Sequence, residues 1–476
     1  MMMDNQNGIE KLAFAISAEE ITMAERSLES ALKAGASGVQ VSLDKARTDI
    51  YALLNGEIDN IRQTGDRALT FRIFADGKYG VFSTNRLDDR SIGHFMKQAV
   101  ENVRLMAEDP YRRLPYESET AKNAVRGDEM ELCWYDYDSV TAEDKMRMVR
   151  EASIYGKEGS SGEGWKLISE EAEYNNTLTD TLLIDSNGLW CRQLETSFEV
   201  CSQVSVEDAG GNIYSGLWWD YAISPEGIRG SGAGLKAVRE AVSQINPVRK
   251  EGGCYRMVVD NRVSGRLVQP VLNALGGRAI FQKSSFLTDA LGKKIFGDGF
   301  TLVDRPGVKG MSGSILFDSE GRACIDRDIV SEGVVKEYFI STYMSGKLGM
   351  EPTSESAMRP VLLPYVKDSE KLTSALREGL DPERMGRDRI LGLCGDGILV
   401  TEFNGGNCNG ATGDFSYGVG GYEFRNGIIT GPVESMVITG NMVSLWNSLI
   451  AAGDDPRNGL SRQIPTIAFE NVVFSA

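Results

Sequence analysis

The chain has 476 residues, a net charge of −17 and a single histidine, His94. One histidine excludes any site in this chain that needs two or three imidazoles, such as a His-rich zinc site. The acidity argues against direct binding of nucleic acid, which requires a basic surface that neutralises phosphates. No stretch is apolar enough to cross a membrane, and the seven scattered cysteines suit free thiols in a reducing compartment. We therefore expect a globular, cytoplasmic protein with no direct contact to nucleic acid or membrane.

The N-terminal part predicts a helix, an antiparallel sheet and a second helix. A capping box at Ser17–Glu20 precedes periodic apolar residues that end at Gly35, which predicts a helix over 17–35. Three runs with alternating or β-rich character follow, and the last turns back at Asp76-Gly77. A helix over 88–106 completes this part.

The central part continues the sheet between two further helices. Thr141 and Asp144 form a second capping box, which predicts a helix over 142–156. Strands are expected from 168 to 208, with turns at Asn187-Gly188 and Gly210-Gly211. Ser224-Pro225 is a helix start signal, so a helix is expected from there to about 244, where Asn246-Pro247 ends it.

Beyond Cys254 the pattern changes to a strand over 255–260, a helix over 265–275 and many short strands separated by glycines. The predicted fold class is α+β, with two domains, mixed or antiparallel sheets, flanking helices and a C-terminal half rich in short strands. We expect an N-terminal segment 1–115, a central segment 116–245 that completes the N-terminal half, and a β-rich domain 246–476.

Few side chains form a recognisable chemical motif. His94 lies in a predicted helix, and no Cys, His or carboxylate stands three or four residues away, so a half-exposed helix residue is favoured over a catalytic one. Asp136 and Asp138 alternate on a predicted strand, as do Asp326 and Asp328. Each pair offers two carboxylates on one face for a metal or proton, although solvent-facing acids are the favoured interpretation.

The segment 404–413, NGGNCNGATG, has no charge and mostly small side chains. Its glycines let backbone N–H groups approach a ligand, so we expect either a loop that pairs with an extended peptide or holds an oxyanion, or a plain loop between strands. Cys408 within it has no identifiable base in the sequence, which makes a thiolate nucleophile a weak hypothesis.

Several long stretches together resemble the TldD/PmbA family, and specifically its PmbA (TldE) branch. The similarity covers nearly the whole chain, and it rests on NGEIDNIRQTGDRALTFRIFADGKYGVFSTN, Asp109-Pro110, GRLVQPVLNALGGRAIFQKSSFLTDALGKKIF, FTLVDRP and TGDFSYGVGGYEFRNGIITGPVESMVITGN. The resemblance implies a two-domain subunit of a cytoplasmic heterodimeric zinc metalloprotease, whose TldD subunit carries a helical H-E-x-x-x-H motif.

Laid on this sequence, the family's zinc motif falls on residues that cannot bind zinc. The two histidine positions are Gln269 and Ala274, and the glutamate position is Pro270. The third ligand, a cysteine, belongs near LIAAGDDP, but the sequence has no cysteine after Cys408. The resemblance therefore implies no catalytic residue, metal or cofactor in this chain, and zinc in a TldD-like partner.

Other parts of the family pattern remain. Gly405-Gly406 and Thr412-Gly413-Asp414 match the family's C-terminal loop, so the candidates for lining a peptide cavity are Gly405, Gly406, Asn407, Cys408, Thr412, Gly413 and Asp414. The leading hypothesis is a non-catalytic subunit that joins a TldD-like chain and helps admit unfolded peptide. The alternative is a peptide-binding or regulatory protein, either a homodimer or a modulator of another complex such as DNA gyrase. A third hypothesis is a self-sufficient hydrolase that uses Asp326, Asp328 or Cys408.

Overall fold

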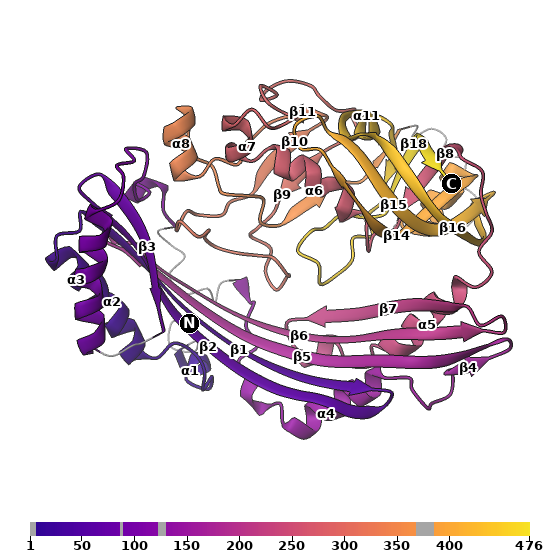
Figure 1. Cartoon of the computed structure of the whole chain (residues 1–476), viewed down its shortest axis with the longest axis horizontal. Helices are drawn as coiled ribbons and strands as arrows, with labels where there is room; N and C mark the ends of the chain where they lie inside the picture. Colours follow the sequence, from indigo (N-terminus) through magenta and orange to yellow (C-terminus); the bar gives the residue numbers. More distant parts are fainter. Residues whose placement is uncertain (1–5, 86–88, 122–129, 368–384) are drawn as a thin grey trace. The chain divides into compact units, whose positions relative to one another are not determined.

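The computed structural model describes residues 6–85, 89–121, 130–367 and 385–476, which divide into two compact units (Figure 1). The first unit contains Met1–Val242, Gly307–Cys324 and Ser341–Met350; the second contains Ser243–Pro306, Ile325–Ile340 and Glu351–Ala476. Both units mix helices with largely antiparallel sheets, which confirms the predicted α+β class.

The first unit is built on a seven-stranded antiparallel sheet in the order β3-β2-β1-β5-β6-β7, with β4 paired to β5. The β1–β2 and β2–β3 hairpins turn where Asn or Asp precedes Gly, and Asn55, Gly56, Asp76 and Gly77 all have positive φ, as two-residue type I′ turns require. The predicted hairpin at Asp76-Gly77 is thus confirmed. The strands are β1 (Gly38–Leu54), β2 (Glu57–Ala75), β3 (Lys78–Thr84), β4 (Ser161–Gly162), β5 (Trp165–Asp185), β6 (Trp190–Asp208) and β7 (Ile213–Ala222).

Helices cover one face of this sheet. Both predicted capping boxes form: Ser17 and Glu20 bond reciprocally at the start of one helix, and Thr141 and Asp144 at the start of another. The predicted helix over 88–106 begins at Asp89 in the structure, and residue 88 lies outside the described residues. The helices of this unit are α1 (Gln6–Ile9), α2 (Ala18–Lys33), α3 (Asp89–Arg104), α4 (Ala142–Ala152), α5 (Ala233–Ser243), α8 (Thr342–Leu348) and the 3-10 turns η1 (Glu117–Glu119), η3 (Tyr137–Ser139) and η4 (Pro225–Gly227).

An ion pair with little exposure fixes α2 on the sheet. The Glu20 carboxylate accepts bonds from Lys45 and Arg67, each at 3.0 Å. Burial opposes ionisation of Glu20, but the hydrogen bonds from the Ser17 N–H, Lys45 and Arg67 outweigh it and lower the pKa of Glu20. The apolar core beneath α2 and α3 includes Leu43 and Phe71, both fully buried.

Two local predictions in this unit are wrong. The helix expected from Ser224-Pro225 begins only at Ala233, because Pro225 starts a single 3-10 turn and Gly230 and Gly232, with φ of 66° and 62°, interrupt the helix. Asp136 directly precedes the 3-10 turn η3, and Asp138 lies within it, so neither is on a strand. They form ion pairs with Lys11 and Arg47 instead of sharing a ligand.

The second unit contains a closed barrel. In its seven-stranded sheet, in the order β13-β17-β18-β16-β15-β14-β8, strand β8 pairs with both β14 and β18, so five strands form a ring. A smaller sheet has the order β11-β10-β9-β12. The strands are β8 (Gly253–Val259), β9 (Leu302–Asp304), β10 (Arg327–Ser331), β11 (Val334–Val335), β12 (Pro360–Leu362), β13 (Tyr365–Val366), β14 (Gly397–Cys408), β15 (Asp414–Arg425), β16 (Ile428–Asn441), β17 (Leu449–Ala452) and β18 (Ile467–Ser475).

The helices of the second unit are α6 (Gly265–Ala274), α7 (Gly277–Phe281), α10 (Arg387–Cys394) and α11 (Met442–Asn447). The helix expected over 265–275 is confirmed by α6. All seven cysteines are free thiols. Within the described ranges, no helix is long and apolar enough to cross a membrane.

Candidate functional site

The candidate site lies in the second unit, where β14 continues past its barrel neighbour. Strand β14 pairs with β8 only over Ile398–Val400, whereas it pairs with β15 as far as Cys408. Its pairing with β15 is interrupted twice by bulges, at Thr401 and at Asn404. The segment 404–413 is therefore only in part the predicted loop: Asn404–Cys408 belongs to β14, and the turn follows. Beyond Val400 the outer edge of β14 lacks β8 as a pairing partner.

Gly406 is the residue that this geometry requires. Its φ is 89°, and a Cβ placed there would lie 2.0 Å from the Ser416 carbonyl oxygen on β15. A side chain would collide with backbone, so only glycine permits this approach of the two strands. Neighbouring Gly405 and Asn407 are exposed on the same edge. The peptide-cavity candidates of β14 thus share one exposed strand edge.

Hydrogen bonds hold the turn between β14 and β15. The Asn441 side-chain amide donates to the Thr412 carbonyl and to the Asp414 carboxylate, each at 2.9 Å, and the Thr412 hydroxyl donates to Asp414 at 2.7 Å. The bonds from Asn441 and Thr412 lower the pKa of Asp414, so this carboxylate is ionised at neutral pH. Gly413, with φ of 81°, lets the chain reverse before Asp414.

Helix α6 contacts the same strand edge. The Arg266 guanidinium, near the start of α6, donates to the Gly406 carbonyl at 3.3 Å and lies 5.5 Å from the ring centroid of Tyr417. The chain after α6 reaches the turn, because the Phe286 N–H donates to the Gly410 carbonyl at 2.9 Å. The structure thus brings α6 and the 404–414 segment, singled out separately in the sequence, to one place.

The zinc-motif positions on α6 hold no metal ligand. The Gln269 amide donates to Asn273 one turn on, at 2.6 Å, and Ala274 is 2% exposed within the core. Pro270 has no N–H and no side-chain donor atom. Where the family's third ligand belongs, β17 is followed by Asp455, which accepts bonds from Thr466. These residues do not fit a catalytic zinc, and across the described part of the chain no cluster of three or more Cys, His, Asp or Glu could hold a metal ion.

The remaining candidates show no catalytic geometry. Burial and, secondarily, the Asp414 carboxylate raise the pKa of the Cys408 thiol, which opposes thiolate formation. Asp326 and Asp328 approach the Arg305 guanidinium, at 3.6 and 3.7 Å, as ion-paired surface carboxylates. His94 lies in a helix, α3, as expected, and it is exposed, not half-exposed.

Three residues of the site were not predicted: Arg266, Tyr417 and Asn441. Arg266 stands three residues before Gln269 and four before Pro270. Residues at these spacings lie on the same side of a helix, so the sequence could have indicated that Arg266 lies beside the zinc-motif positions. Asn441 contacts Asp414 only because the β15–β16 register places the two residues opposite each other. No local pattern in the sequence contains that register.

Comparison with known proteins agrees with this architecture. Residues 252–476 match the description of a PmbA/TldA metallopeptidase C-terminal domain, and residues 39–103 match PmbA/TldA metallopeptidase domain 1. A solved structure from Bacteroides thetaiotaomicron, described as a proposed modulator of DNA gyrase, is 31% identical, with a TM-score of 0.88 over 97% of this chain and 100% of the other. The chain belongs to the PmbA/TldD metallopeptidase family.

Two curated relatives are described as PmbA proteins. The chain is 27% identical over 457 residues to a metalloprotease PmbA homolog of Haemophilus influenzae, with 94% of each chain covered. It is 24% identical over 431 residues to metalloprotease PmbA of Escherichia coli O157:H7, with 88% of each covered. A TldE structure from Thermococcus kodakarensis shares the fold, with 15% identity and a TM-score of 0.75 over 95% of this chain and 100% of that one. The chain is thus similar to PmbA members of the family.

Proposed function

We propose that this chain is a non-catalytic subunit of a heteromeric metalloprotease, that a TldD-like partner carries the zinc, and that the complex acts on unfolded peptides. The observation that carries the proposal is the chemistry of α6. An amide, an imino acid and a buried methyl group occupy the positions where the resemblance puts two imidazoles and a carboxylate. A metallopeptidase fold without metal ligands supports a division of labour between two subunits.

The edge of β14 supports a role in peptide handling. Among the described residues no strand pairs with the outer edge of β14 beyond Val400, and such an edge offers backbone N–H and C=O groups to an extended chain, which gives affinity without reading sequence. Gly405, Gly406 and Asn407 leave this edge free of bulky side chains. Arg266 already bonds the Gly406 carbonyl, so it stands at the place where an extended peptide would pair.

Reconstitution tests the proposal. The chain and a TldD-like chain are purified separately, and cleavage of an unstructured peptide is measured for each alone and for the mixture. Only the mixture should cleave. Substituting the zinc-motif histidines of the partner should abolish cleavage, whereas Gln269→Ala in this chain should leave the zinc content of the mixture unchanged. Cleavage by the partner alone at the rate of the mixture would contradict the proposal.

A regulatory role is the second candidate, favoured by the description of the Bacteroides thetaiotaomicron relative as a proposed modulator of DNA gyrase. With a net charge of −17, such a role would act on a protein and not on DNA directly. Stable assembly with DNA gyrase, together with failure to bind any TldD-like chain in size-exclusion chromatography, would favour this candidate.

A further inference from the structure

The tip of the β1–β2 hairpin presents an apolar surface beside α4. A bulge between Ala52 and Leu53 pairs Tyr51 with Ile61 and Leu53 with Ile58. Because directly opposed residues point to the same face of a sheet, the bulge puts both isoleucines, three residues apart, on the face that α4 occupies. Ile58 and Ile61 are each 53% exposed, so this part of the face lacks a full apolar cover.

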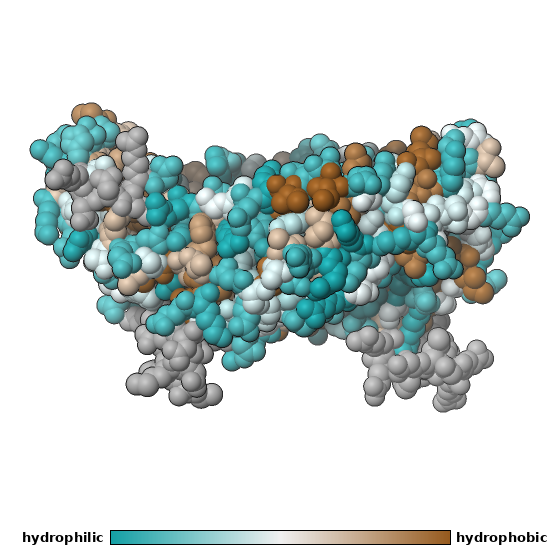
Figure 2. All heavy atoms as spheres, turned by 90° about the horizontal axis from the view of Figure 1, so that it is seen from below, coloured by the Kyte–Doolittle hydropathy of each residue, from teal (hydrophilic) through white to brown (hydrophobic). Residues whose placement is uncertain are grey.

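Side chains from the N-terminal segment and α2 cover this face of β2 only as far as the middle of the strand. At Arg67 the face meets Glu20 of α2, and at Gly65 it meets Phe14, whose ring would lie 2.9 Å from a Cβ at that glycine. Toward the hairpin tip, every residue of β2 from Glu57 to Arg67 is exposed. Seen from below the view of Figure 1, the surface is largely hydrophilic, with apolar side chains in small groups (Figure 2).

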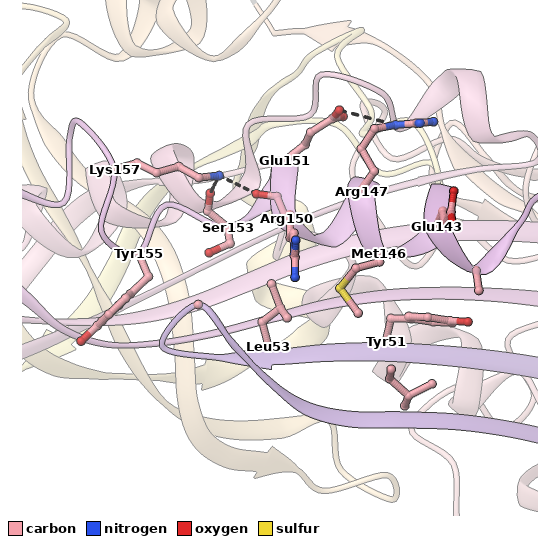
Figure 3. A pocket seen from close by; sticks show the side chains of 13 residues that line it. Tyr51, Leu53, Glu143, Met146, Arg147, Arg150, Glu151, Ser153, Tyr155 and Lys157 are labelled. Carbon is pink, nitrogen blue, oxygen red and sulfur yellow. Dashed lines mark hydrogen bonds and ion pairs between the residues drawn. The ribbon is translucent and has the colours of Figure 1, made fainter.

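Together α4 and the hairpin enclose a groove of about 1010 Å³. Its floor includes Tyr51, Leu53 and Ile61, and its wall is a stripe of α4 that includes Met146 and Arg150. Both of these side chains extend from α4 toward the strand that bears Leu53 and Tyr51 (Figure 3). The groove therefore combines an apolar floor with a cationic side chain that reaches into it.

At one end of the groove, Arg150 and Lys157 have no carboxylate partner among the described residues, whereas the lining carboxylate Glu143 lies in the first turn of α4. Lys157 donates only to backbone carbonyls, those of Arg150 at 2.5 Å and Ser153 at 2.6 Å, and within the described residues Arg150 forms no ion pair. Arg147, by contrast, is engaged by Asp144 and Glu151. In a chain with a net charge of −17, this cationic end calls for an acidic group on whatever fills the groove.

We propose that this groove docks an amphipathic α-helix of a partner protein, with apolar side chains at i, i+3 or i+4 and i+7 and a carboxylate that meets Arg150 and Lys157. A helix is the occupant that the fold indicates, because the other helices on this face, α2, α3, α4 and α5, pack on its strands, whereas the described part of β2 from Glu57 to Arg67 is exposed. Apolar anchors set by helical spacing suit a floor formed by two adjacent strands.

A designed peptide tests this site on the full chain. The probe is a fluorescein-labelled helical peptide of about 18 residues, with leucines on one face and two glutamates near one end. Fluorescence anisotropy should show saturable binding, and Ile61→Ser and Arg150→Glu should each weaken it about tenfold. Two exposed positions elsewhere provide matched controls: Arg62→Glu, on the opposite face of β2, and Ile213→Ser, on β7, should leave the affinity unchanged.

Two altered peptides complete the test. Replacing the glutamates with lysines should abolish binding by charge repulsion, and a central proline should abolish it by breaking the helix. Binding that is insensitive to Ile61→Ser and Arg150→Glu, equal binding of the lysine or proline peptide, or no saturable binding would overturn the proposal. So would a dimer of this chain, seen by analytical ultracentrifugation, that Ile61→Ser dissociates, because the occupant would then be a second copy.

Discussion

The Arg266 guanidinium donates a hydrogen bond to the Gly406 carbonyl at 3.3 Å. This contact joins α6, the helix with the degenerate zinc motif, to the outer edge of β14. The α6 helix and the 404–414 segment, which the sequence indicated as candidates for unrelated reasons, are therefore parts of one surface. The contact also covers a carbonyl that an extended peptide would otherwise meet.

Arg266→Ala should leave the fold intact. The side chain is exposed and its bond is long, so we expect the free energy of unfolding to fall by less than about 1 kcal/mol. Arg192→Ala offers the contrast, because Arg192 is 8% exposed and binds Asp180 through two nitrogens at 3.0 and 2.6 Å, and its loss should cost about 3 kcal/mol or more. Urea unfolding measures both. An equal cost for the two variants would contradict this ranking.

Gly406→Ala should be strongly destabilising. The positive φ and the 2.0 Å approach to the Ser416 carbonyl oxygen leave no room for a Cβ, so we expect a loss of about 2 kcal/mol or more. Gly418→Ala in the paired strand is the control, since its Cβ would meet Asn404 at an ordinary 3.7 Å. Thermal unfolding of both variants decides the matter: a Gly406→Ala protein as stable as Gly418→Ala would show that the bulged geometry is wrong.

Cys408 should react slowly with thiol reagents near neutral pH. Burial and the Asp414 carboxylate raise the pKa of its thiol above the ordinary 9.0, so little thiolate forms. Asp414→Asn should lower that pKa and speed alkylation by iodoacetamide, followed at Cys408 by peptide mass spectrometry. Rapid alkylation at pH 7 in the unmodified protein would argue for an activated nucleophile and revive the self-sufficient hydrolase hypothesis.

Glu20 should make folding stability depend on pH in the acid range. Its folded pKa is lowered from 4.5, so its contribution is fully present above pH 4.5 and is lost as the pH falls through the folded value. Glu20→Gln leaves Lys45 with the Ala15 carbonyl but without its carboxylate partner, and it should cost about 3 kcal/mol at pH 7, with the difference shrinking below pH 4.5. The exposed Glu25→Gln on the same helix should cost little at any pH. A constant difference between Glu20→Gln and the unmodified protein from pH 7 to 3 would refute the assignment.

Local signals in the sequence were sufficient for the elements that depend on neighbours along the chain. The capping boxes at Ser17 and Thr141 fix where α2 and α4 begin, because each is satisfied within four residues. The start of α5 was predicted too early, at Ser224-Pro225. Two glycines with positive φ, Gly230 and Gly232, follow that proline and delay the helix to Ala233. Here the backbone freedom of glycine mattered more than the start signal.

The features of the fold that the sequence did not predict depend on pairing between strands that are far apart in the chain. The barrel closes because β8, in the middle of the chain, pairs with β18, near its C-terminal end, and no local pattern specifies that contact. The bulges at Thr401 and Asn404 depend on the register with β15, so half of a segment expected as a loop is strand. For the site, the family resemblance located Gln269, Pro270 and Ala274, whereas the contacts of Arg266 and Asn441 required the fold.

Zinc analysis with a peptide cleavage assay on the purified chain alone tests the central claim most directly. The account predicts far less than one zinc per chain after incubation with excess zinc and removal of unbound metal, and no cleavage of an unstructured peptide. Addition of a TldD-like chain should restore both. One zinc per chain together with cleavage by the isolated protein would contradict the account.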